Sequence, residues 1–200
     1  LHSGVGSVNT FRTTTSGTLL QTINTSGIYV EGHAQAQDGT LWFLGSQSGF
    51  PTLYSGAVGS STISSALSSF TGNLDAHLTV HGNQAIFQSY TGNLVHFMSA
   101  NVNGTVANNL VDYRQTGNNL SGRGTGIGHN GLTYFLAYDY TALNHRLYKW
   151  MPGSINPQYL TLSNTISAEG MAVVVAPEPA SMIALGAGVL ALVRRRRRTA

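Results

Sequence analysis

Short apolar runs alternate with turns rich in glycine and asparagine along most of the chain. Three segments share a turn followed by an aromatic-bearing apolar run: "AQAQDGTLWFLG" (34–45), "LTVHGNQAIFQS" (78–89) and "GIGHNGLTYFLA" (126–137). Superposition on the shared phenylalanine aligns three turn dipeptides: Asp38-Gly39, Gly82-Asn83 and Asn130-Gly131. Glycine and asparagine tolerate the positive φ angles that two-residue turns of the primed types require. The pattern therefore predicts three tight hairpins, each leading into a strand that holds Phe43, Phe87 or Phe135.

A charged residue followed by a small one precedes each hairpin and occurs again near the end of the chain. The four pairs are Glu31-Gly32, Asp75-Ala76, Arg123-Gly124 and Glu169-Gly170, spaced by 44, 48 and 46 residues. Third apolar runs lie at 51–58, 92–100 and 145–153, and a weaker fourth run lies at 158–164. Four short strands in a repeat of about 45 residues are typical of a β-propeller blade. We therefore predict an all-β, propeller-like body with blades starting near residues 31, 75, 123 and 169. A β-sandwich with similar hairpins is the alternative.

The repeats do not add up to a complete ring. Three whole repeats are preceded by half a repeat (8–30) and followed by one strand (Met171–Val175). Complete propellers usually have four to eight blades. The last strand can pair with the leading ones, but one strand would still be absent from that blade. We therefore expect the first half of the leading blade to precede Leu1.

Charge and cysteine content exclude several classes of function. Charged residues make up 8% of the chain, against about 25% in a typical globular domain. Five of the ten basic residues form one cluster at the end of the chain, while all seven acidic residues precede that cluster. The body is therefore slightly acidic and has no basic stripe for nucleic acid. The absence of cysteine excludes disulfides, thiolate metal sites and cysteine nucleophiles.

The last 24 residues differ in kind from the body. Pro177 and Pro179 end the strand before them, because proline cannot donate to a β-ladder. Every residue from 180 to 193 is apolar or small, and as a helix this run would extend about 21 Å. A hydrocarbon core is about 30 Å thick, so the predicted helix is short for a permanent anchor. The run ends in Arg194, Arg195, Arg196, Arg197 and Arg198. Such a cluster tends to stay cytoplasmic, which would place the body across the membrane.

This tail resembles the PEP-CTERM sorting signal of bacterial envelope proteins. The resemblance rests on Pro177-Glu178-Pro179, the apolar run 180–193 and the cluster Arg194–Arg198, in that order at the end of the chain. It implies that a transpeptidase-like enzyme of the inner membrane, exosortase, recognises the signal and cleaves near the Pro-Glu-Pro. These residues would then be a substrate motif, which divides the chain into a body (1–176) and a signal (177–200). A permanent anchor, a buried helix and a nucleic-acid-binding tail are the alternatives.

The body offers few residues with which to build a catalytic site. Glu31, Asp75, Arg123 and Glu169 occupy equivalent positions, so in a ring they would surround one mouth of the central channel. There they would contact a ligand, or else they are exposed charges that discourage edge pairing. The histidines at equivalent positions are His33 with His77 and His81 with His129. They lack the convergent spacing of a metal site, and we predict neither a metal nor a cofactor.

These observations favour an exported surface protein whose body binds something without catalysis. Candidate partners are polysaccharide and other components of the envelope or matrix, and nucleic acid is excluded. The candidate residues for stacking on sugars are Trp42, Tyr54, Tyr138, Tyr140 and Trp150, although the same residues suit a blade core. A secreted polysaccharide hydrolase or lyase that uses Glu31, Asp75 and Glu169 is the alternative, because glycoside cleavage needs paired carboxylates. A purely structural envelope component is a third.

Overall fold

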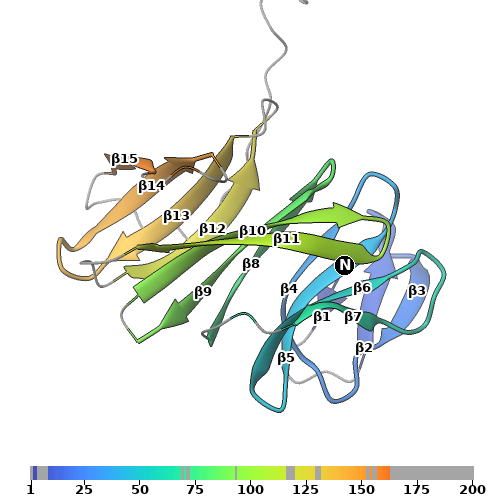
Figure 1. Ribbon diagram of the computed structural model, residues 1–200. Helices are drawn as coiled ribbons and strands as arrows, with labels where there is room; N and C mark the ends of the chain where they lie inside the picture. Colours follow the sequence, from blue (N-terminus) through green and yellow to red (C-terminus); the bar gives the residue numbers. More distant parts are fainter. Residues whose placement is uncertain are drawn as a thin grey trace, which may run out of the picture.

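The computed structural model consists of antiparallel β-sheets (Figure 1). It describes residues 2–3, 9–68, 70, 73–92, 94–115, 120–128, 132–151, 154 and 157–162. Within these residues there are fifteen strands and no helix, and no sheet closes into a barrel. The all-β class predicted from the turn-and-strand pattern is confirmed. The predicted helix at 180–193 and the strand at 171–175 lie outside the described residues.

Each sheet is a meander in which neighbours in sequence are neighbours in space. The first sheet holds β1 (His2–Ser3), β2 (Asn9–Thr13) and β3 (Leu19–Asn24). The second holds β4 (Tyr29–Gln35), β5 (Leu41–Gln47), β6 (Phe50–Gly56) and β7 (Ser64–Ser68). The third holds β8 (Asn73–His81), β9 (Gln84–Thr91), β10 (Leu94–Asn103) and β11 (Val106–Gln115). The fourth holds β12 (Leu120–Ile127), β13 (Thr133–Asp139), β14 (Asn144–Trp150) and β15 (Gln158–Thr161). The predicted third runs correspond to β6, β10 and β14, and the weak fourth run corresponds to β15.

The first sheet differs from the expectation of half a repeat. It contains three strands, because residues 2–3 pair with Phe11 and Thr10 of β2. A strand of two residues carries no periodicity, so the sequence pattern could not reveal it. Within the described residues, β1 has a single neighbour and its other edge is free of a strand.

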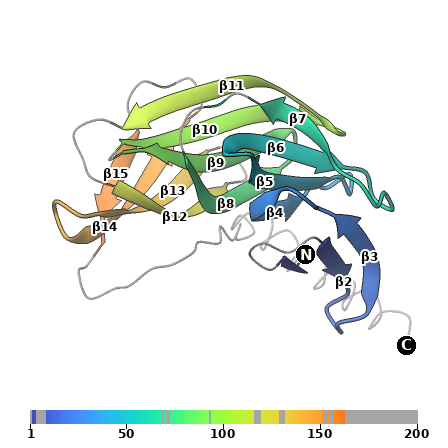
Figure 2. The same ribbon diagram turned by 90° about the horizontal axis from the view of Figure 1, so that it is seen from below.

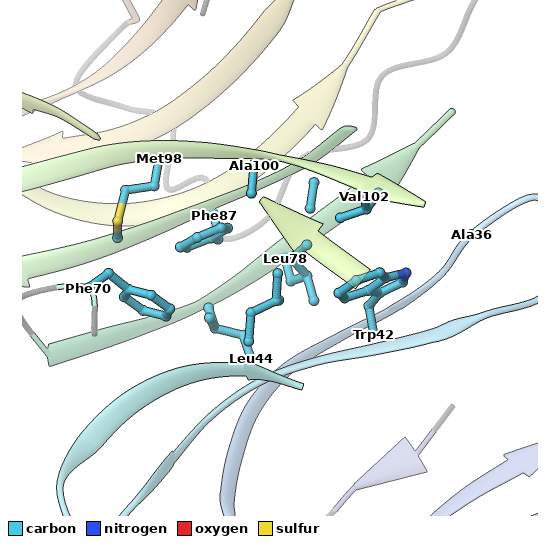
Figure 3. Packing of buried hydrophobic residues seen from close by; sticks show 12 residues of the cluster. Ala36, Trp42, Leu44, Phe70, Leu78, Phe87, Met98, Ala100 and Val102 are labelled. Atoms are coloured by element: carbon cyan, nitrogen blue, oxygen red, sulfur yellow. The ribbon is translucent and has the colours of Figure 1, made fainter. Parts of the chain in front are cut away.

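Successive sheets pack face to face because side chains alternate along each strand. On β5, Trp42 and Leu44 point into a core shared with the third sheet, and Leu41 and Phe43 point into a separate cluster. Figure 3 shows Trp42 and Leu44 facing Phe87 across the first of these cores. On β9 the same alternation separates Phe87 from Ile86, which belongs to the core between the third and fourth sheets. Each central strand is therefore buried on both faces and reads as a continuous apolar run.

The core between the third and fourth sheets is largely aromatic. The rings of Phe97 and Phe135 stack with their centroids 4.5 Å apart, and Tyr148 lies 4.9 Å from Phe97. Phe135 also lies 5.8 Å from Trp150, which is almost fully buried. Burial of each such ring stabilises the fold by about 1.5–3 kcal/mol. Of the three phenylalanines on which the sequence segments were superposed, Phe135 thus belongs to this core, whereas Phe43 and Phe87 belong to the other two.

The first strands of the three four-stranded sheets lie side by side, with β8 between β4 and β12. Side-chain hydrogen bonds join the third and fourth sheets, which share no backbone ladder. Thr79 Oγ1 lies 2.8 Å from Thr125 Oγ1, and Gln88 Nε2 donates to the Gly124 carbonyl at 2.9 Å. The outer strands β7 and β11 are also neighbours (Figure 2). The sheets therefore succeed one another in the order of the chain.

The turns agree only in part with the predicted two-residue type. Gly82-Asn83 is such a turn, since His81 pairs with Gln84 and Gly82 has φ of 54°. The Asp38-Gly39 turn is longer, because the Gly39 amide donates to the Ala36 carbonyl at 3.0 Å. Asp38 Oδ1 also accepts from the Thr40 amide at 2.9 Å, and such side-chain capping favours a wider turn. Asn130-Gly131 lies outside the described residues.

Candidate functional sites at the two ends of the sheets

Two of the recurrent charged residues occupy β-bulges at the beginning of a first strand. Val30 and Gly32 pair with consecutive residues of β5, so Glu31 is the extra residue of β4. Arg123 is the extra residue of β12 in the same way. A bulge re-aims the side chain that it carries, and bulges are frequent beside functional sites. Both side chains are half-buried.

Asp75 and Glu169, the other two recurrent charged residues, do not occupy bulges of the same kind among the described residues. Asp75 is on β8 opposite Gln88, and the irregularity there lies one step later, between Asp75 and Leu78. The β8 strand thus has one more unpaired residue than β4 or β12. Glu169 lies outside the described residues. Glu31, Asp75 and Arg123 therefore occupy the same end of three neighbouring strands, and the predicted ring of four stays a prediction.

Arg123 has an aromatic neighbourhood at this end. Its Nη2 donates to the Tyr140 hydroxyl at 3.4 Å, and Tyr140 is 48% exposed. Tyr140 packs edge-on against Tyr138 at 4.9 Å. We call Glu31, Arg123, Tyr138 and Tyr140 the charged end. Of the aromatic residues considered for sugar stacking, Tyr138 and Tyr140 lie here, whereas Trp42, Tyr54 and Trp150 are buried in the cores.

The opposite end of the sheets is hollowed between three hairpins. Two adjoining cavities of about 180 and 250 Å³ share Asn83, Val102 and Asn103 in their walls. The smaller cavity is also bounded by Asp38 and Trp42, and the larger by Asn101 and Asn108. We call the two together the hairpin cleft. No periodic pattern in the sequence marks this cleft, although the stretch "NVNGTVANN" (101–109) contains three of its asparagines as a visible cluster.

The histidines do not form a metal site within the described part of the chain. His33 and His77 are half-buried on β4 and β8, and His81 is exposed. Among the described residues, no three histidine or acidic side chains are placed to hold a metal ion. His129 lies outside them.

A buried histidine that the sequence pattern did not indicate lies on β10. His96 Nδ1 is 3.0 Å from Asp112 Oδ1, and His96 pairs across the strands with Ser89. These are the residue types of an acyl-transfer triad. Ser89 and His96 are almost fully buried, however, and neither bounds the hairpin cleft. Since neither of the two cavities that the described residues form reaches them, we assign this row to packing.

The sorting residues Pro177, Glu178 and Pro179 and the cluster Arg194–Arg198 lie outside the described residues, and their individual roles stay predictions. Residues 175–198 match the PEP-CTERM protein-sorting motif. The chain is therefore an exported, envelope-associated protein that is sorted by its C-terminal signal. The PEP-CTERM motif implies processing by exosortase, a membrane enzyme. No curated protein matches the chain.

The match leaves the body to be interpreted from its geometry, because it covers only the tail. In the described part of the chain, no helix is both long and apolar enough for a membrane span. The apolar run 180–193 of the PEP-CTERM motif falls outside that part.

Proposed function

We propose that this protein is delivered to the cell surface or extracellular matrix and there acts as a non-catalytic binding or structural body. The run 180–193 is held transiently in the inner membrane with the arginine cluster on the cytoplasmic side. Exosortase then cuts near Pro177–Pro179 and frees the body. The observation that carries this proposal is the sorting motif at residues 175–198.

The sorting step is tested by the mass of the mature protein from the surface or medium of its native host. The wild-type product should end near Pro179, and a variant with Pro177, Glu178 and Pro179 changed to alanine should keep its full tail. A control with His81→Ala, an exposed residue of the body, should be cut like the wild type. An intact tail on membrane-bound wild-type protein would instead identify an ordinary anchor.

We further propose that the body is a β-propeller whose ring is closed by residues 169–175. Three features support this: the four-stranded meanders, the adjacent first strands, and the front sheet of three strands with β1 at its free edge. The segment "EGMAVVV" repeats the charged-small start of β4 and β8. Placed beside β1, it would bring the front sheet to four strands.

Ring closure is tested by disulfide trapping, for which the chain is suited because it contains no cysteine. Ser3→Cys is combined in turn with a cysteine at each of residues 171–175, and one position should oxidise readily when strands are adjacent. Thr161→Cys combined with the same set is the control. Trapping to residue 161 and never to residue 3 would place the segment beside β15 and contradict the closed ring.

The alternative function, a polysaccharide hydrolase or lyase, draws support from the bulges that hold Glu31 and Arg123. It predicts turnover of a glycan that is abolished by Glu31→Gln, Asp75→Asn or Glu169→Gln. Absence of turnover on a broad glycan panel would exclude it. A purely structural role predicts no saturable binding to whole cells or glycans.

A further inference from the structure

The walls of the hairpin cleft are polar and apolar in about equal parts, and they are nearly uncharged. Four asparagines bound it: Asn83, Asn101, Asn103 and Asn108. Asp38 is the one charged residue among its described walls, which contain no cation. An amide offers two donors and an acceptor side by side. Such walls suit a ligand with many hydroxyl groups and no charge, and their described residues offer no cation to a phosphate or carboxylate.

The cleft is held in shape by hydrogen bonds between its hairpins. The Val102 amide donates to the Asn83 carbonyl at 2.9 Å, which ties the β8–β9 turn to β10. Ser55 Oγ donates to the Thr105 carbonyl at 2.6 Å, which ties the β10–β11 turn to the second sheet. A β-bulge in β10–β11 places Asn109 at φ of 51°, next to the cleft residue Asn108. The asparagine side chains therefore project from backbones that are already fixed, and this lowers the entropic cost of binding.

Trp42 supplies a second, independent observation. Its ring is completely buried in the core between the second and third sheets, and it also bounds the smaller cavity. Among the described residues, its Nε1–H has no hydrogen-bond partner. Figure 3 shows this nitrogen at the edge of the ring toward Ala36 and Val102, two further residues of the cavity wall. A buried donor without an acceptor is unfavourable by about 1–3 kcal/mol. A ligand oxygen that displaced the side chains covering this nitrogen from the smaller cavity would relieve that cost.

We infer that the hairpin cleft binds one or two uncharged sugar units of a glycan chain, with the asparagine amides and Trp42 Nε1–H as hydrogen-bond partners. The inference rests on the proposed binding function of the body and gives it a site. Each cavity is smaller than the roughly 300 Å³ at which pockets for drug-sized ligands begin. Short segments of a neutral polysaccharide fit this size, and the rest of the glycan would continue into solvent.

Indole NMR provides the first test, because the chain contains only two tryptophans. Full-length, ¹⁵N-labelled protein in a non-glycosidic detergent is titrated with neutral glucan, mannan and galactan oligosaccharides, and with oligogalacturonate as the charged comparison. The Trp42 indole N–H signal, assigned with Trp42→Phe, should move saturably with a neutral sugar. The Trp150 Nε1–H, which donates to the Ser154 carbonyl at 3.0 Å, is the internal reference and should stay in place.

Variants then locate the site. Asn103→Ala and Asn108→Ala should each weaken the Kd about three- to tenfold, as the loss of one hydrogen bond predicts. Arg123→Ala at the charged end should leave the Kd unchanged. A Kd that responds to Arg123→Ala and not to the asparagines would move binding to the other end and overturn the inference, while the body would remain a binding module. No saturable shift with any neutral sugar would also overturn it. If the protein showed no such shift but host cells still bound it saturably, the inference about the hairpin cleft would be wrong and the proposed binding function of the body would remain supported.

Discussion

The Arg146 guanidinium lies 2.7 Å from the carboxylate of Asp139, and the side chain of that aspartate is completely buried. Asp139 Oδ1 also accepts from the amides of Thr141 and Ala142, so the carboxylate fixes the turn between β13 and β14. On its other side, Arg146 stacks over the Tyr159 ring of β15 at 4.7 Å. One ion pair therefore connects the last three strands of the fourth sheet.

Removal of one partner should leave a buried charge without compensation. We expect Arg146→Met to lower the free energy of unfolding by about 3 kcal/mol, measured by urea denaturation. Lys149→Met, a change of an exposed lysine on the same strand, should alter it by less than about 0.5 kcal/mol. The double variant Asp139→Asn with Arg146→Met should lose less than the sum of the single changes. Additive losses would show that the two side chains do not interact.

We expect the free energy of unfolding to fall at alkaline pH because of Tyr148. Burial raises the pKa of its hydroxyl above the usual value of 10.0, and the neighbouring Arg146 opposes that shift only in part. As the pH rises, the phenol ionises in the unfolded chain at a lower pH than in the folded protein. In that pH range the folded state keeps a proton that the unfolded state has released, so the unfolded state is favoured. The contribution of Tyr148 is thus complete below about pH 10 and declines as the pH rises toward the folded pKa.

Urea unfolding at several values between pH 8 and pH 11 measures this decline. Tyr148→Phe should flatten it by up to about 1.4 kcal/mol per pH unit, the limit for one proton. Tyr140→Phe, at a 48% exposed residue, is the matched control. An unaltered slope in the Tyr148 variant would show that its phenol ionises equally in both states.

Gly45 of β5 has no room for a side chain. A Cβ atom there would lie 2.8 Å from the Tyr29 carbonyl oxygen and 2.9 Å from Ile28 Cγ2. Because backbone is one of the obstacles, we expect Gly45→Ala to destabilise the fold by about 1–3 kcal/mol, measured by thermal or urea unfolding. Gly56→Ala meets Ile63 Cγ2 at 3.0 Å and the Thr62 carbonyl oxygen at 3.1 Å, both farther away than the obstacles at Gly45, and should be less harmful. A larger effect at Gly56 than at Gly45 would contradict this ranking.

The positive charge of the arginine cluster should determine whether the tail is held in the membrane in the orientation that allows its cleavage. Replacement of Arg194–Arg198 by serine removes the charges that, in the proposed topology, hold the end of the chain on the cytoplasmic side. We expect a larger fraction of the exported protein to retain its tail, detected by the mass of the C-terminal peptide. Lysine in all five positions should preserve cleavage, since charge and not the guanidinium sets the orientation. Failure of the lysine variant would point to direct recognition of arginine by the processing enzyme.

Two kinds of feature could be predicted from the sequence: the strands that belong to repeated hairpins, and the sorting signal, whose parts follow one another in a fixed order. The phenylalanine of each hairpin strand and its turn predicted the central strands, and alternation along β5 and β9 explains why both of their faces are buried. The order of proline motif, apolar run and arginines predicted the sorting signal, which residues 175–198 match.

Other features left no periodic trace. The strand β1 is only two residues long, and the bulges at Glu31 and Arg123 depend on pairing partners that composition does not reveal. The Asp38-Gly39 turn was predicted to have two residues but is longer. Its conformation depends on the Asp38 carboxylate, which accepts a hydrogen bond from the Thr40 amide. The hairpin cleft combines Asp38 and Trp42 of one sheet with asparagines of the next, so only tertiary packing brings its walls together.

The first strands of the second and third sheets run in the same direction, from the charged end to the hairpin cleft. A closing strand at residues 169–175 that copied them would deliver the chain to the cleft end of the body. Pro177 follows two residues later, a distance of about 7 Å at the rise of an extended chain. Before cleavage the cleft would then face the lipid surface at close range, where a polysaccharide has no space to enter. If the cleft binds a glycan as inferred, proteolysis would then be the activating event, because it would separate the cleft from the membrane.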